Sequence, residues 1–148
     1  MSAEQPLKVM VYSDDRNTRQ AIRTALGRVV AADLPPIETV DVATGQAVIH
    51  TLDNENFDAL VLDGEAVPTG GMGLSYQLHD EIADCPPVLL LVARQDDAWL
   101  AAWSRAEAVT GLPVDPLTLP GIFAEMMRKH RDRDTDEVAT FDAPVTHA

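Results

Sequence analysis

Short apolar runs alternate with amphipathic segments along most of the chain. The runs are rich in strand-forming residues and end in capping or turn residues, which predicts strands at residues 8–12, 37–42, 58–63, 88–92 and 108–112. Between them, apolar side chains recur three and four positions apart, which predicts helices at residues 18–30, 45–52, 73–82, 99–106 and 117–127. Strand and helix therefore alternate along nearly the whole chain.

This alternation, with its short connections, predicts an α/β fold built on a five-stranded parallel sheet that is doubly wound by helices. The third run is apolar on both faces until its last residue, Asp63, so we expect both faces of the sheet to be covered. In such sheets the functional crevice lies at the carboxyl ends of the strands, where the strand order reverses. The acidic residues that follow the first and third strands should meet there.

Length and composition favour a single domain. The chain has 148 residues, of which 46% are hydrophobic. Residues 1–6 and the polar, aperiodic stretch 129–148 are predicted to be disordered, which leaves residues 7–128 as the domain. Residues after 128 leave no room for a DNA-binding output domain. We therefore expect a stand-alone protein.

The sequence also bears on compartment and metal chemistry. No apolar stretch approaches the roughly 18 residues of a membrane span, and the amino terminus lacks the basic and apolar regions of a signal peptide. We expect a cytoplasmic protein without membrane insertion. The single cysteine, Cys85, cannot form a disulfide within the chain or a cysteine-based zinc site, so a bound metal would need oxygen ligands.

Charge argues against nucleic-acid binding. The chain has 11 Lys and Arg against 24 Asp and Glu, a formal net charge of −13. Binding to phosphate backbones requires a basic footprint. The one basic cluster, residues 128–133, is interleaved with acids and is interpreted as a solvated helix end.

The residues around the predicted strand ends carry a family resemblance. An acidic pair and a downstream arginine lie in Val11–Ile22, and an apolar strand ends in aspartate at Asp58–Asp63. Pro86–Arg94 forms a fourth strand, and Leu112–Pro116 contains a proline segment. In this order and spacing, from about Leu7 to Arg128, the segments resemble the receiver domain of bacterial two-component response regulators. The resemblance implies a flavodoxin-like, CheY-like (βα)5 fold.

The resemblance implies a phosphoacceptor and a metal site. Asp63 matches the phosphoacceptor, and Mg²⁺ would be held weakly by oxygens of Asp14, Asp63 and Glu65. Aligning Arg19 with the family's helix arginine makes Ser13 and Asp14 the acidic pair, with one acid lost. Sliding the alignment by one residue restores Asp14 and Asp15 as the pair but moves Arg19 out of phase. We favour the first alignment and keep Asp15 as the alternative metal ligand.

Three positions depart from the family pattern. Val92 replaces the hydroxyl residue that ends the fourth strand, Leu112 replaces the lysine before proline, and Val109 stands near the aromatic switch position. Neither of the two lysines in the chain can reach the crevice, which leaves Arg94 as the candidate for positive charge. We therefore expect phosphorylation to be slow and to lack the residues that convert it into a conformational change.

Two tryptophans, Trp99 and Trp103, lie four positions apart on one predicted helix. They either fill the core or anchor a protein interface. In receivers this helix contributes to the partner-binding face, which here would comprise Trp99–Ala106, the following strand and Leu117–Met127. A homodimer and a heterologous protein are both candidate partners, and a histidine kinase is the candidate upstream partner.

Three functional hypotheses follow. The favoured one is a non-enzymatic, atypical receiver that acts as a signalling protein-interaction module with weak or absent phosphorylation. The alternative is a conventional phosphoaccepting receiver in a two-component phosphorelay, with Asp63 phosphorylated in the presence of Mg²⁺. A small phosphohydrolase with an aspartate nucleophile needs an Asp-x-Asp motif after the first strand, which residues 13–15 do not supply.

Overall fold

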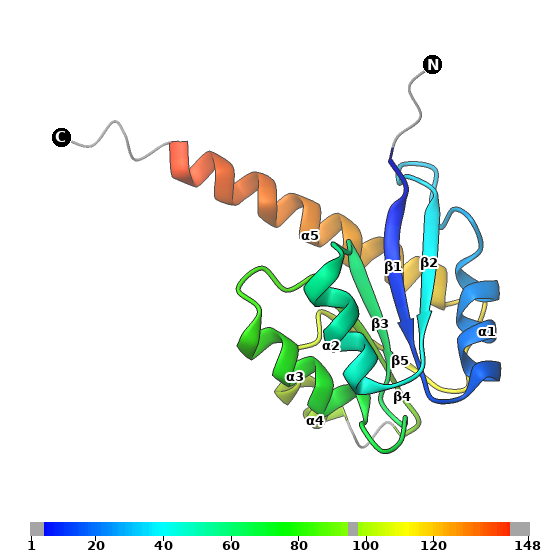
Figure 1. The fold of residues 1–148 in the computed structure, drawn as a ribbon. Coiled ribbons are helices and arrows are strands. Elements are labelled where there is room, and N and C mark those ends of the chain that lie inside the picture. Colours follow the sequence, from blue (N-terminus) through cyan, green and yellow to red (C-terminus); the bar gives the residue numbers. More distant parts are fainter. Residues whose placement is uncertain (1–4, 95–97, 143–148) are drawn as a thin grey trace.

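The computed structural model describes residues 5–94 and 98–142, in which strands and helices alternate along the chain (Figure 1). The strands are β1 (Leu7–Tyr12), β2 (Ile37–Val42), β3 (Ala59–Asp63), β4 (Val88–Val92) and β5 (Ala108–Gly111). The helices are α1 (Arg16–Leu26), α2 (Gly45–Asn54), α3 (Gly71–Glu81), α4 (Ala98–Trp103) and α5 (Leu119–Asp142). No helix in these described ranges is both long enough and apolar enough to cross a membrane.

The five strands form one parallel sheet in the order β2-β1-β3-β4-β5, which confirms the predicted fold class. The order reverses between β1 and β3, which are hydrogen-bonded neighbours with Tyr12 opposite Leu62. Ser13 and Asp63, which follow this pair, therefore leave the sheet side by side. The topology places the candidate crevice at the point expected for such sheets.

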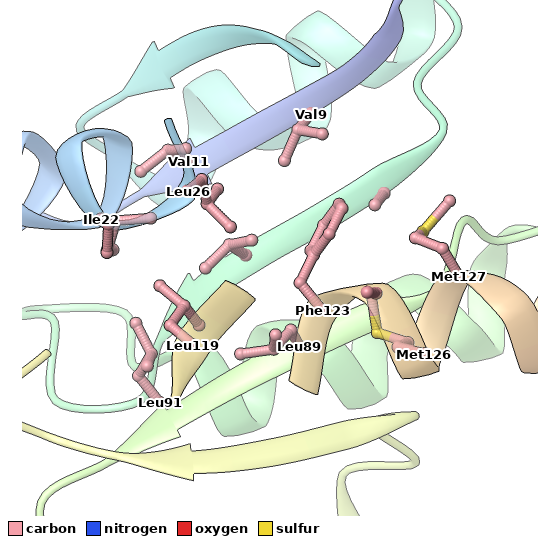
Figure 2. Close-up of a cluster of buried hydrophobic side chains, with 14 of the residues drawn as sticks. Val9, Val11, Ile22, Leu26, Leu89, Leu91, Leu119, Phe123, Met126 and Met127 are labelled. Atoms are coloured by element: carbon pink, nitrogen blue, oxygen red, sulfur yellow. The ribbon is translucent and has the colours of Figure 1, made fainter. Parts of the chain in front are cut away.

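The core is divided into two clusters by the sheet. Successive strand residues point to opposite faces. Val9, Val11, Leu89 and Leu91 pack with α1 and α5 on one face, and Figure 2 shows them with Phe123 of α5. On the other face, alternate strand residues pack with α2 and α3, among them Met10, Tyr12, Leu60, Leu62, Leu90 and Val92. Both faces of the sheet are covered, as the apolar third strand predicts.

Helix α1 is shorter than the apolar pattern predicts. It ends at Leu26 rather than at Val30. Gly27 adopts a φ of 64°, a left-handed conformation that favours glycine, and its N–H donates to the Arg23 carbonyl. The residues beyond it belong to a loop, in which Val29 is exposed. The predicted helix end was therefore wrong, because two loop valines extend the apolar spacing.

Helix α5 is longer than predicted and extends well beyond the sheet (Figure 1). The sequence predicts a helix that ends at Met127 and a disordered tail from residue 129, whereas the helix continues to Asp142. Arg128 donates from Nε and Nη2 to the Asp33 carboxylate at 2.9 and 2.7 Å, and Lys129 pairs with Glu125 at 3.2 Å. Arginine, lysine and glutamate are good helix formers, and pairs four residues apart such as Glu125 and Lys129 stabilise a helix, so this part of α5 can be helical without an apolar stripe. The helix end was therefore predicted wrongly; residues 143–148 lie outside the described residues.

Candidate functional site

Asp63 is the last residue of β3, and its side chain is buried at the carboxyl edge of the sheet. Each carboxylate oxygen accepts a hydrogen bond. Oδ2 accepts from the Ser13 hydroxyl at 2.8 Å, and Oδ1 accepts from the backbone N–H of Glu65 at 2.8 Å. The carboxylate is therefore held by two donors from the chain itself, which offset part of the cost of burying it.

The three residues after β1 have different roles. Ser13 is fully buried, and its hydroxyl both donates to Asp63 and accepts from the Asp15 N–H at 3.0 Å. The Asp14 carboxylate accepts from the Val67 N–H at 3.3 Å across the crevice. Asp15 instead caps α1, accepting from the Asn17 N–H at 2.8 Å. Ser13 thus contacts Asp63, Asp14 contacts the β3–α3 loop and Asp15 caps the helix; which two of these residues correspond to the family's acidic pair stays a prediction.

Arg19 contacts the backbone of the segment that follows β1. Its Nη1 donates to the Ser13 carbonyl at 2.6 Å, and its Nε lies 3.4 Å from the Asp41 carboxylate. The arginine thereby fixes the backbone that carries Ser13, one turn of α1 away.

Tyr12, the last residue of β1, is fully buried close to these acids. Its hydroxyl donates to the Thr69 carbonyl at 2.5 Å, which ties β1 to the β3–α3 loop. Burial raises the pKa of Tyr12, and the negative charges of Asp14 and Asp63 raise it further. The phenol of Tyr12 therefore stays protonated.

The β3–α3 loop packs closely against the strand ends. A Cβ on Gly64 would lie 2.6 Å from the Leu91 carbonyl oxygen, and one on Gly71 would lie 2.8 Å from the Asp63 carbonyl oxygen. Both contacts are with backbone atoms, so no side chain fits at either position. Glu65 points across the loop and accepts from the Ala93 N–H at 3.4 Å. The loop is thus a close backbone fit around Asp63.

The oxygens at this edge are a weak donor set for Mg²⁺. The family pattern supplies two carboxylates after β1, but here one of them is the hydroxyl of Ser13, which binds Asp63 directly. Among the residues that the structure describes, no three His, Cys, Asp or Glu side chains cluster closely enough to hold a metal ion. Hard cations prefer several oxygen ligands, so the residues present do not fit a tight Mg²⁺ site. Weak binding by Asp14, Asp63 and Glu65 remains a prediction.

The side chains at the switch positions are packed in the core or exposed to solvent. Val92 is buried in the α2–α3 core cluster, and Leu112 packs against the cluster beneath α1 and α5. Val109 on β5 is exposed, as is Arg94 after β4. The Leu112–Pro113 peptide is cis. None of these four side chains makes a hydrogen bond to Asp63.

Both tryptophans lie on the surface. Trp99 is 69% exposed and Trp103 is 51% exposed, which answers the question of core or surface that the sequence leaves open. Trp103 stacks on Tyr76 of α3, with ring centroids 4.5 Å apart. Exposed Val109 follows on β5. These three exposed side chains, Trp99, Trp103 and Val109, are called the α4–β5 surface below.

Sequence reasoning missed two contacts at the site. It treated Ser13 as a lost acid and did not predict that its hydroxyl would donate to Asp63. It also gave no role to Tyr12. A signal was present for Ser13, because a small polar residue directly after a buried strand must find a partner when it is buried.

Comparison with known proteins identifies the family. Two proteins from two strains of Mycobacterium tuberculosis, each named an uncharacterized response regulatory protein, are 50% identical to this chain over 122 residues. The match covers 82% of this chain and 92% of each relative. The chain belongs to the response regulator family. No family model matches this response regulator.

Solved structures with the same fold agree. The response regulator superimposes on a CheY-like receiver domain protein from Methanospirillum hungatei with a TM-score of 0.71 at 16% identity, covering 87% of this chain and 99% of the other. The BeF₃-activated receiver domain of DrrB gives 0.65 at 19% identity, covering 84% and 99%. Receiver domains are non-catalytic signalling modules that interact with kinases and other proteins and generally bind Mg²⁺ for phosphorylation. The response regulator is therefore a signalling protein and not an enzyme.

Proposed function

We propose that this response regulator is an atypical receiver that signals by binding a protein partner at the α4–β5 surface, which is formed without phosphorylation, and that phosphorylation of Asp63 is weak or absent. The observation that carries the proposal is the hydrogen bond from Ser13 to Asp63. It places a neutral donor of the chain where a metal-binding carboxylate is expected. The acceptor aspartate is thereby satisfied without a cation.

The switch positions support the same proposal. A phosphoryl group on Asp63 carries negative charge, which is normally met by a cation and a hydroxyl donor. Val92 and Leu112 offer neither, since both side chains are packed in the core clusters. Phosphorylation of Asp63 would therefore form no hydrogen bond or ion pair with the side chains at positions 92 and 112, and could not move α4 or β5 through them.

The α4–β5 surface supplies the binding half of the proposal. Trp99 and Trp103 are exposed on consecutive turns of α4, and tryptophan is enriched at the energetic centres of protein interfaces. Large exposed aromatic side chains of this kind mark interaction sites on soluble proteins. The predicted face also includes Leu117, which is 91% exposed at the start of the α5 region. A second copy of the chain and a heterologous protein would compete for this surface.

A conventional phosphoaccepting receiver is the alternative, and Asp63 favours it because an aspartate stands at the expected strand end. Labelling of Asp63 with a small-molecule phosphodonor at millimolar Mg²⁺ distinguishes the conventional receiver from the atypical one. We expect no appreciable label on the wild-type chain. Stoichiometric labelling that Asp63→Asn abolishes would replace our proposal with the conventional one.

The binding surface is tested by affinity capture from native lysate with four baits. These are the wild type, Asp63→Asn, the double variant Trp99→Ala/Trp103→Ala, and Val29→Ala as a matched loss of an exposed apolar side chain elsewhere. Circular dichroism establishes that each bait is folded. We expect the tryptophan variant alone to lose its partners. If Asp63→Asn loses them and the tryptophan variant keeps them, binding depends on phosphorylation and uses another face.

A further inference from the structure

Helix α3 is joined to the end of α4 and to the start of β5 by three side chains, two of them adjacent in sequence and the third about one turn further along the helix. Ser75 donates to the Ser104 carbonyl at 2.9 Å, Tyr76 stacks on Trp103, and His79 contacts Glu107. Ser75 and Ser104 are fully buried. We call these three contacts the α3 clasp.

The hydrogen bonds of His79 identify its protonation state. Its Nδ1 lies 2.7 Å from the Ser75 carbonyl oxygen, and its Nε2 lies 3.0 and 3.1 Å from the two Glu107 carboxylate oxygens. Carbonyl and carboxylate oxygens can only accept, so both ring nitrogens must donate. A neutral imidazole has one donor only. The clasp in this geometry therefore requires the imidazolium form of His79.

Glu107 connects this histidine to the sheet. Its Oε1 also accepts from the Val88 N–H at 2.7 Å, and its own N–H donates to the Val88 carbonyl at 2.9 Å. The carboxylate is thereby fixed at the β4–β5 edge. A change at His79 moves α3 relative to that edge, because Glu107 itself is anchored.

The remaining contacts carry such a change to the α4–β5 surface. Trp103 rests on the ring of Tyr76, and Arg105 lies over the same ring at 4.8 Å from its centroid. Tyr76 is three residues before His79, so the two occupy neighbouring positions on α3. The position of Trp103 therefore follows that of the α3 segment 75–79.

We propose that protonation of His79 closes the α3 clasp and sets the exposure of Trp103, so that the α4–β5 surface responds to pH rather than to phosphorylation. This regulation rests on the proposed function, because it acts on the same surface. Loss of the proton removes one of two donors. When the remaining proton stays on Nδ1, with the Ser75 carbonyl of the same helix, the Glu107 carboxylate faces the lone pair of Nε2 and α3 is released from the β4–β5 edge.

The groups around His79 together raise its pKa, which favours the imidazolium form. The hydrogen bond to Glu107 raises the pKa of His79 above its usual 6.5, and the bond to the Ser75 carbonyl and the charge of Glu107 raise it further, against the effects of burial and Arg105. Burial, together with the charge of Glu107, raises the pKa of the neighbouring Cys85 thiol to about 12. Cys85 therefore stays neutral in the range where His79 titrates.

Trp103 itself provides the reporter. In Trp99→Phe it is the only tryptophan of the chain, and acrylamide quenching of its emission can be followed from about pH 6 to about pH 9. We expect quenching to increase with pH, with a midpoint above 6.5. His79→Gln in this background should abolish the transition. His50→Gln, which removes an exposed histidine on α2, should leave it unchanged.

A second variant keeps the test decisive if His79→Gln does not fold. Glu107→Gln retains hydrogen-bonding capacity but removes the charge, so the midpoint should fall towards 6.5. Quenching that is independent of pH in the Trp99→Phe chain, a transition that persists in folded His79→Gln, or an unchanged midpoint in Glu107→Gln would each overturn the proposal. No partner is needed for this experiment, so its outcome is independent of affinity capture.

Discussion

Ser13 is the residue that most distinguishes this receiver. It stands where the resemblance places an acid, and its hydroxyl instead bridges the Asp63 carboxylate and the Asp15 N–H. One side chain thus connects β3, β1 and the cap of α1. A carboxylate at this position would face Asp63 across a buried edge and would need a cation between them.

Replacing Ser13 tests this role in two ways. Ser13→Ala leaves the buried Asp63 oxygen without its donor and should lower the free energy of unfolding by about 1–3 kcal/mol. Ser13→Asp should also destabilise the chain in a chelator, because it adds a like charge, but it should gain stability with Mg²⁺. Urea unfolding with and without Mg²⁺ measures both effects. A Mg²⁺ response of the wild type equal to that of Ser13→Asp would contradict the assignment.

At the scale of elements, the β3–α3 loop and α5 depend on opposite kinds of contact. The loop fits against strand ends through backbone atoms at Gly64 and Gly71. The extended part of α5 is held at its base by charged side chains, Arg128 with Asp33 above all. The fit of the loop is short-ranged and steric, whereas the Arg128–Asp33 ion pair is exposed and screened by salt.

Gly71→Ala should be destabilising. Its new Cβ would lie 2.8 Å from the Asp63 carbonyl oxygen and 3.1 Å from the Gly64 nitrogen, so the start of α3 must move away from β3. Overpacking of this kind costs about 1–3 kcal/mol. Gly73→Ala on the same helix meets no atom within 4 Å and should stabilise by about 0.5–1 kcal/mol. Chemical denaturation compares the two, and equal effects would contradict the close fit.

Arg128→Gln should loosen α5 beyond the sheet. Arg128 lowers the pKa of Asp33 to about 2, mainly through their hydrogen bond, and this bond ties the helix to the loop before β2. Amide hydrogen exchange in residues 128–142 should therefore become faster in the variant. Lys129→Gln loses only a partner on the same helix, Glu125, and serves as the matched control. The same exchange rates in both variants would show that the Asp33 link does not hold α5.

At the scale of the whole molecule, the two candidate sites lie at different parts of one sheet. The crevice is formed where β1 and β3 end, whereas the α4–β5 surface and the α3 clasp lie beside β4 and β5. In receivers, signalling normally requires the phosphoacceptor site to influence the α4–β5 surface. In this chain we propose that the α3 clasp controls the α4–β5 surface through its own contacts.

The clasp gives the stability of the whole chain a pH dependence. The pKa of His79 is raised in the folded state, so its contribution is fully present below the unfolded value of about 6.5 and is lost as pH rises through the folded value. The urea midpoint should therefore fall over this range in the wild type and in His50→Gln. His79→Gln should lack this component. An equal decline in all three would assign the pH dependence to other groups.

The sequence by itself determined the local elements and the chemistry that the crevice lacks. Alternating apolar runs define strands and helices because each reflects burial of one face, and Asp63 at a strand end follows from the same pattern. The replacement of the family's hydroxyl residue by Val92 and of its lysine by Leu112 is visible without coordinates. The family resemblance rested on the order of these segments, which folding preserves.

Only the tertiary structure decided which partners the polar and aromatic residues find. Ser13 meets Asp63 across 50 positions of the sequence, and Arg128 meets Asp33 across 95, so neither contact leaves a periodic signal. Helix α4 spans only Ala98–Trp103, too short for its spacing to define a buried face, and Trp103 finds its partner on α3, at Tyr76. Periodicity reports how much of an element is buried, whereas topology decides what it is buried against.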